Sequence, residues 1–204
     1  MCGIVGYVGT NNVPNREYFA LDVVLEGLRR LEYRGYDSAG VAMLEGGKIN
    51  FRKKAGKVAG LDEEIARDPL PDSVVGIGHT RWATHGAPTD ANAHPHVVDG
   101  GKLAVVHNGI IENFAELKTE LAAKGYTFAS ETDTEVAATL LGDSMNGEGN
   151  GDLTESMRLT CNRLEGAFTL LALHVEVPDR IVAARRNSPL VIGLGEGENF
   201  LGSD

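Results

Sequence analysis

The segments with strand-like sequence occur in groups, and the segments with helical periodicity lie between those groups. Apolar and β-branched runs predict strands at residues 3–9, Ala39–Leu44, Ile49–Lys53, Val74–His79, Leu103–His107, Ala167–Val175, Arg180–Ala184 and Leu190–Leu194, and near Phe200. Apolar residues at helical spacing predict helices at Arg16–Arg34, Glu112–Lys124, Asp133–Met145 and Leu153–Leu164. Because strand and helix do not alternate strictly, this order favours an α+β fold with largely antiparallel sheets over a doubly wound parallel sheet.

The connections between these segments differ in length. Glu45-Gly46-Gly47 predicts a tight hairpin, and the Gly/Asn-rich residues Asn146–Asp152 predict a surface loop. Val74–His79 and Leu103–His107 form a second hairpin-like pair, separated by the long polar stretch Thr80–Lys102. A connection of this length inside a compact domain is usually functional. It carries several side chains that could bind a polar ligand, namely Arg81, Trp82, Thr84, His85, Asn92, His94 and His96.

Charge and composition exclude several classes of function. The chain has 204 residues, 29 of them acidic and 19 basic, and its net charge of −10 disfavours binding to nucleic acid or to an anionic membrane surface. No apolar run approaches the roughly 20 residues that a membrane helix needs, and residues 1–9 lack the basic leader of a signal peptide. With two cysteines, the chain is expected in a reducing cytoplasm. The sequence stops at Asp204 directly after a predicted strand, so we expect a longer protein.

Cys2 is a candidate nucleophile because it becomes the first residue once Met1 is removed. The α-amine has a pKa of about 7.7–8.0 and the thiol one of about 8.5, so one residue can supply both the general base and the nucleophile. Position alone leaves open that Cys2 is an incidental small residue at a terminus. The other cysteine, Cys161, falls on the apolar face of a predicted helix and is expected to act as a small hydrophobe.

Three further positions could complete such a site, and each has a simpler explanation. The side-chain amide of Asn108 and the backbone N–H of Gly109 could form an oxyanion hole, although Asn-Gly is also a favoured turn pair. Arg81 could bind a carboxylate, or it could belong to a surface ion pair of small energy. Asp133 could bind an ammonium group, or it could be the N-cap of a helix.

Metal and nucleotide sites find little support in the sequence. Five of the six histidines lie between His79 and His107, and His94-Pro95-His96 could offer a ligand pair. No zinc-type spacing of cysteine or histidine accompanies them, and no glycine-rich phosphate loop occurs. We therefore expect no metal and no cofactor.

Six motifs resemble a known family. CGIVGYVG, LEYRGYDSAG, GHTRWATHG, NAHPH, HNGIIEN and SETDTE occur in this order. The chain is similar, across residues 2–204, to the glutaminase half of the glutamine–fructose-6-phosphate aminotransferases, a class II glutamine amidotransferase domain. The resemblance implies a four-layer αββα N-terminal nucleophile hydrolase sandwich with two mostly antiparallel sheets.

The resemblance also implies roles for individual residues. Cys2 would attack the side-chain amide of L-glutamine and form a thioester, with Asn108 and Gly109 at the oxyanion hole. The substrate would be bound by the residues Arg81 (α-carboxylate), Asp133 (α-ammonium), Thr84, His85 and Trp82, the last of which resembles the family tryptophan that helps to close the site. A C-terminal sugar isomerase half, absent from this sequence, would use the ammonia to convert fructose 6-phosphate into glucosamine 6-phosphate. The full-length enzyme would be a homodimer.

Three rival interpretations remain. Amidophosphoribosyltransferases share CGI and HNG with this chain, but they typically carry HRGQ-type and RYSTAG-type motifs where it has YRGYDS and RWATHG. A binding module without turnover could keep the pocket, although nucleophile, oxyanion asparagine and substrate arginine are all present. An N-terminal nucleophile protease of proteasomal type would usually begin with threonine.

Overall fold

The computed structural model describes residues 2–10, 18–83 and 86–204. Within these residues the strands pair into two sheets in which all neighbours are antiparallel. The six-stranded sheet contains, in spatial order, β3 (Lys48–Ala55), β2 (Ser38–Glu45), β4 (Val75–Arg81), β1 (Gly3–Gly9), β10 (Glu198–Gly202) and β9 (Val191–Leu194). The four-stranded sheet contains β5 (His96–Val98), β6 (Leu103–Ile111), β7 (Gly166–His174) and β8 (Val182–Arg186).

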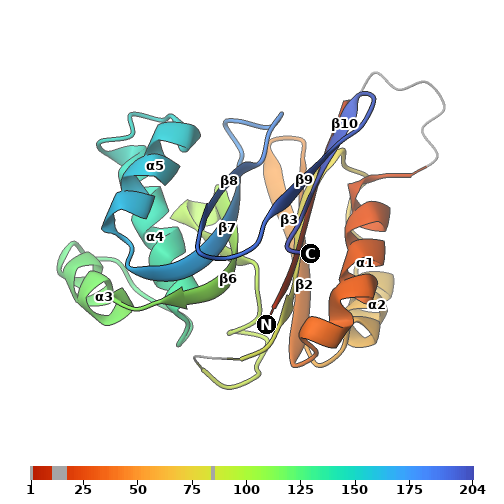
Figure 1. Cartoon of the computed structure of the whole chain (residues 1–204), viewed down its shortest axis with the longest axis horizontal. Helices are drawn as coiled ribbons and strands as arrows, with labels where there is room; N and C mark the ends of the chain where they lie inside the picture. The colour runs from red at the N-terminus through yellow and green to blue at the C-terminus, as the bar shows by residue number, and fades with distance from the viewer. Residues whose placement is uncertain (1, 11–17, 84–85) are drawn as a thin grey trace.

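Helices cover the outer face of each sheet, as Figure 1 shows. The six-stranded sheet carries α1 (Ala20–Leu31) and α2 (Val58–Arg67). The four-stranded sheet carries α3 (Phe114–Ala123), α4 (Asp133–Asn146) and α5 (Leu153–Arg163). Short 3₁₀ turns follow α1 at Glu32–Arg34 and β5 at Asp99–Gly101. The order helix, sheet, sheet, helix is the four-layer αββα sandwich that the family resemblance implied.

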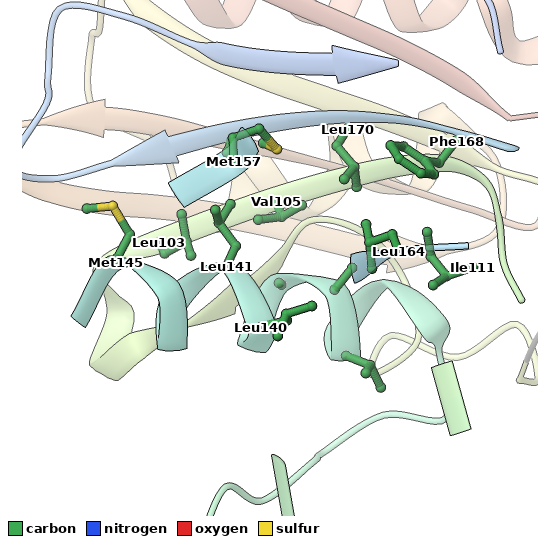
Figure 2. Packing of buried hydrophobic residues seen from close by; sticks show 14 of the residues in the cluster. Leu103, Val105, Ile111, Leu140, Leu141, Met145, Met157, Leu164, Phe168 and Leu170 are labelled. Carbon is green, nitrogen blue, oxygen red and sulfur yellow. The ribbon is translucent and has the colours of Figure 1, made fainter. Parts of the chain in front are cut away.

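The period of two along each strand explains how the layers hold together. On β6, Leu103 and Val105 face α4, whereas Ala104 and Val106 face the other sheet. Figure 2 shows Leu103 and Val105 packed beside Leu141 of α4. Each strand of this kind is buried on both faces, so its apolar residues form a nearly continuous run. Three apolar clusters result, one between the sheets and one under each helical layer.

Several predicted elements are correct to within a few residues. The hairpin of β2 and β3 turns at Gly46 and Gly47, whose φ angles of 59° and 71° are those of a type I′ turn. Helix α1 begins at Ala20, later than the predicted Arg16, because the Asp22 carboxylate accepts the Phe19 N–H at 2.8 Å and starts the helix there. Part of that prediction lies outside the described residues.

Other predictions are wrong. The segments Val74–His79 and Leu103–His107 are not a hairpin-like pair, since β4 and β6 belong to different sheets. Both strands are buried on both faces, so their sequences carry no sign of which sheet each one joins. The polar stretch between them contains the short strand β5. Helix α2 was not predicted, although its apolar residues Val58, Leu61 and Ile65 recur at helical spacing and pack against the core.

Candidate active site

The position of Cys2 follows from the pairing of β1 with β4. Gly3 lies opposite Thr80, so Cys2 stands beside the end of β4, where the chain leads into Trp82. The Trp82 N–H donates to the Cys2 sulfur at 3.3 Å, and the Trp82 carbonyl oxygen lies 3.6 Å from the same sulfur. The thiol is therefore held against both peptide groups of Trp82, just after the end of a buried strand.

The oxyanion-hole candidates come from the other sheet. Asn108 and Gly109 lie on β6, and the Asn108 side-chain amide donates to the Cys2 carbonyl oxygen at 2.9 Å. Gly109 has φ of 130°, and a Cβ atom there would lie 2.1 Å from the Ala167 carbonyl oxygen. Only glycine fits this backbone. The turn interpretation of Asn-Gly is wrong, because both residues belong to a strand.

Arg81 is the last residue of β4, and its side chain is buried. Its guanidinium donates to the carbonyl oxygens of Gly86 at 3.1 Å and Ala87 at 3.3 Å, and it lies 3.7 Å from Asp37 Oδ1. Because the group is buried and lines the pocket beside Cys2, a surface ion pair does not describe it.

Asp133 opens α4 but does not cap it. The N-cap is Thr132, whose side chain accepts the Glu135 N–H, so the N-cap explanation of Asp133 is wrong. The Asp133 carboxylate is buried, and its Oδ2 accepts the Ile111 N–H at 2.9 Å. Its Oδ1 lies 3.8 Å from Nδ1 of His107. A buried carboxylate in the pocket wall offers a negative charge to a cationic ligand.

Trp82 lies at the entrance to the site. Its side chain is 47% exposed, and its ring meets that of Tyr36 edge to face at 5.4 Å. Thr84 and His85, predicted to bind the substrate, lie outside the described residues.

One pocket brings the predicted residues together. Its lining consists of Cys2, Arg81, Trp82, His94, His107, Gly109, Thr132, Asp133 and Thr134. Asn108 reaches the same place through its bond to the Cys2 carbonyl. Thr132 and Thr134 were not predicted as site residues, although both belong to the SETDTE motif.

The histidines beside the pocket form a buried stack. The centroids of the His79 and His94 rings lie 4.0 Å apart, and the His107 backbone N–H donates to His94 Nδ1 at 3.3 Å. Burial lowers the pKa of His79 to about 3 and lowers that of His94 well below its usual range. The stacked rings are therefore neutral at pH 7, as parts of a packed core. Among the described residues no group of three or more His, Cys, Asp or Glu side chains could hold a metal ion.

The two cysteines differ in their surroundings. Burial raises the pKa of the Cys2 thiol, while the Trp82 N–H and the Arg81 charge lower it and the Asp37 charge raises it. A thiol of raised pKa stays protonated at neutral pH, so attack by Cys2 requires a base to remove its proton. Cys161 is half-buried on α5 and packs against the cluster beneath the four-stranded sheet, as predicted.

Residues 79–204, more than half of the chain, match the glutamine amidotransferase domain family. The chain therefore belongs to the glutamine amidotransferase domains. The matched stretch includes Arg81, Trp82, Asn108, Gly109 and Asp133 and begins after Cys2.

Particular relatives carry a more specific name. Over its whole length the chain is 77% identical to the glutamine–fructose-6-phosphate aminotransferase (isomerizing) of Corynebacterium diphtheriae, of which it covers 33%. The proteins of the same name from Corynebacterium glutamicum and Streptomyces coelicolor are 74% and 62% identical to it, with 33% and 32% of their lengths covered. The chain thus spans about a third of the length of the curated relatives that it matches.

Solved structures agree with the fold. The glutamine phosphoribosylpyrophosphate amidotransferase from B. subtilis, complexed with ADP and GMP, matches 99% of this chain and 42% of its own with a TM-score of 0.80 at 25% identity. A second structure, described as the allosteric regulatory enzyme of purine biosynthesis, matches the same shares with a TM-score of 0.81 at 26% identity. The αββα amidotransferase fold is thereby confirmed.

Proposed function

We propose that this domain hydrolyses the side-chain amide of L-glutamine to glutamate and ammonia, with Cys2 as the nucleophile. One observation supports this most strongly. The Cys2 sulfur, two oxyanion donor candidates, a buried guanidinium and a buried carboxylate all adjoin one pocket. A free amino acid has a carboxylate and an ammonium at one end and, in glutamine, an amide at the other, so this set of groups matches it.

The chemistry begins with the α-amine of Cys2 after Met1 has been removed. The amine takes the thiol proton, and the thiolate attacks the amide carbon of glutamine. The negative charge that develops on the amide oxygen is stabilised by the Asn108 side chain and the Gly109 N–H. The protonated amine gives its proton to the departing ammonia, and water then hydrolyses the thioester to release glutamate.

Arg81 and Asp133 hold the substrate by its charged end. The guanidinium binds the α-carboxylate and the Asp133 carboxylate binds the α-ammonium, which directs the side-chain amide toward Cys2. Trp82 at the entrance, together with Thr84 and His85, completes the binding site in this proposal.

Residues 2–204 act within a larger enzyme in this proposal. Relatives three times as long are named glutamine–fructose-6-phosphate aminotransferases, and their names support a sugar-isomerising partner domain in the same polypeptide. That domain would use the ammonia to turn fructose 6-phosphate into glucosamine 6-phosphate, a precursor for amino sugars, in a homodimeric enzyme. A cytoplasmic location stays a prediction. Among the described residues, no helix is long and apolar enough to cross a membrane.

A glutaminase assay combined with mass spectrometry of the N-terminus tests the proposal. Protein whose mass places Cys2 first is expected to release glutamate from glutamine, and protein that retains Met1 is expected to be inactive. Full activity with Met1 attached contradicts the amine-as-base mechanism, because the Cys2 nitrogen is then an amide. Absence of activity in fully processed protein contradicts the function itself.

The amidophosphoribosyltransferase alternative rests on the solved structures. These structures are 25–26% identical to this chain, far below the 62–77% of the glutamine–fructose-6-phosphate aminotransferases. The aminotransferase assignment is therefore supported much better than the amidophosphoribosyltransferase one. The glutaminase step is common to both names, and the partner domain is what distinguishes them. A binding module without turnover is excluded by glutamate release in the same assay.

A further inference from the structure

Asp37 contacts the backbone on both sides of Trp82. The Asp37 N–H donates to the Arg81 carbonyl oxygen at 3.1 Å, and its Oδ2 accepts the Ala83 N–H. The bracketed residue, Trp82, is the one whose N–H lies against the Cys2 sulfur. Asp37 therefore bonds to the two peptide groups on either side of Trp82, and the Trp82 N–H and carbonyl oxygen of these same groups contact the thiol.

The same carboxylate faces the substrate-binding arginine. Asp37 Oδ1 lies 3.7 Å from Arg81 Nη1 and accepts the Ser38 hydroxyl at 3.1 Å. Asp37 is thus connected to the nucleophile through Trp82 and to the pocket wall through Arg81.

Asp37 itself is anchored firmly. It directly precedes β2, whose first residue, Ser38, pairs with Arg81, and the Asp37 carbonyl oxygen accepts the Gly56 N–H at 2.7 Å. The chain just before it packs closely on the end of β4, since a Cβ atom at Gly35 would lie 2.6 Å from the Arg81 carbonyl carbon. An anchor held by several backbone contacts can transmit a precise position to what it binds.

We propose that Asp37 is a positioning residue of the glutaminase site, which holds the Trp82 peptide against the Cys2 sulfur and the Arg81 guanidinium in the pocket wall. This inference rests on the proposed function for its catalytic consequence. It does not make Asp37 a proton carrier. Among the described residues its carboxylate contacts the Ala83 N–H, the Ser38 hydroxyl and the Arg81 guanidinium, and it makes no hydrogen bond to the Cys2 sulfur.

The two influences of Asp37 on the thiol oppose each other, and variants can separate them. The Asp37 charge raises the pKa of Cys2, whereas the Trp82 N–H that it positions lowers that pKa. Asp37→Asn removes the charge and keeps an oxygen that can accept the Ala83 N–H. Asp37→Ala removes both. Asp37→Glu keeps the charge and displaces the carboxylate by one methylene.

Asp90→Asn is a matched control. The Asp90 carboxylate also bridges a backbone N–H, that of Ala55 at 2.7 Å, and a cation, Lys54 at 2.9 Å, but it does not line the pocket. This control is expected to leave all kinetic readouts unchanged.

The first readout is the rate at which iodoacetamide alkylates Cys2 as a function of pH, measured by peptide mass spectrometry on processed protein. The amino terminus, Asp37 and Arg81 are the charged groups that act on this thiol, and the amino terminus and Arg81 are common to all variants. Asp37→Asn is expected to shift the midpoint below that of the unchanged protein. Asp37→Ala is expected to lie above Asp37→Asn, because the positioned N–H is lost. Coinciding midpoints for these two variants overturn the proposal.

The second readout is glutamine hydrolysis. Asp37→Asn is expected to raise KM about tenfold, because the Arg81 guanidinium is held less firmly, and to keep kcat within about threefold. Asp37→Ala and Asp37→Glu are expected to lower kcat about 100-fold, because a reacting group displaced by about 1 Å costs a rate factor of this size. If Asp37→Ala does not fold, Asp37→Glu alone decides: unchanged kcat contradicts positioning. If no protein hydrolyses glutamine and the alkylation midpoints still separate, the proposed function has failed and the positioning role stands.

Discussion

The Asn108 side-chain amide donates to the Cys2 carbonyl oxygen across 2.9 Å, and this hydrogen bond joins the two sheets of the sandwich. Asn108 belongs to β6 of one sheet, and Cys2 directly precedes β1 of the other. An amide NH₂ group has two hydrogens, so Asn108 can fix Cys2 with one and still offer the other to a developing oxyanion.

Asn108→Ala tests this double role. We expect kcat to fall about 100- to 1000-fold with a smaller change in KM, because an oxyanion donor acts mainly in the transition state. Steady-state glutaminase kinetics measure this. Asn113→Ala is the control, since the Asn113 amide also donates to a backbone carbonyl, that of Arg163 at 2.9 Å, away from the pocket. A change confined to KM contradicts the oxyanion role.

Gly109→Ala is expected to destabilise the fold as well as the site. The φ of 130° excludes alanine, and the added Cβ would lie 2.1 Å from the Ala167 carbonyl oxygen. Backbone strain alone costs about 1–3 kcal/mol, and the clash adds to it. Urea unfolding measures the difference from Gly100→Ala, where φ is 63° and nothing lies within 4 Å. The control should lose about 1 kcal/mol. Equal losses contradict the steric explanation.

Asp133→Asn tests recognition of the substrate ammonium. The amide oxygen can still accept the Ile111 N–H, so the fold should persist while the charge disappears. We expect KM for glutamine to rise about 10- to 100-fold, as loss of a charged hydrogen bond implies. Asp143→Asn, which loses a surface pair with Lys124, controls for removal of a negative charge. An unaltered KM for Asp133→Asn refutes the assignment.

The two cysteines should respond in opposite ways to replacement by alanine. Cys2→Ala is expected to abolish glutamate release and leave the thermal unfolding transition in place, because its side chain is at the pocket. Cys161→Ala is expected to keep full activity and to lose about 1 kcal/mol of stability, because it removes a half-buried apolar contact. Residual thiol-dependent turnover in Cys2→Ala points to another nucleophile.

His79 should make the protein less stable in mild acid. Its pKa is lowered from 6.5 to about 3, first by burial, so between these values the unfolded chain binds a proton that the folded chain does not. The free energy of unfolding therefore falls as pH falls through this window, by about 1.4 kcal/mol per pH unit for this residue. Urea unfolding from about pH 4 to pH 6 should show a slope smaller by one proton in His79→Gln. Identical slopes contradict the burial of a neutral imidazole.

Much of the fold could be predicted because its causes are local. The hairpin at Gly46-Gly47 and the helix starting at Leu153 follow from turn residues and apolar spacing. The partner of each central strand could not be predicted, because β4 and β6 are equally apolar on both faces. Helix α2 was missed although Val58, Leu61 and Ile65 recur at helical spacing within its ten residues.

The candidate site divides in a similar way. Cys2, Asn108, Gly109, Arg81 and Asp133 were proposed from their chemistry and their motifs, and the structure places all five at one site. The contacts of Asp37 on both sides of Trp82 could not be predicted, because Asp37 precedes β2 and Trp82 follows β4, and these two segments meet only in the folded chain. His94-Pro95-His96 offered a possible metal-ligand pair in the sequence, whereas in the structure burial lowers the pKa of both rings well below its usual range and keeps them neutral.

The apolar cluster between the sheets has a consequence for engineering. Ile4 and Ile77 on one sheet pack in one cluster with Val106 and Leu171 on the other, and these side chains set the spacing between Cys2 and Asn108. A repacked interior that raises the melting temperature can therefore misalign the reacting groups. Thermostabilising libraries for this domain belong in the two outer, helix-covered layers, and any variant of the inner layer should be selected by turnover.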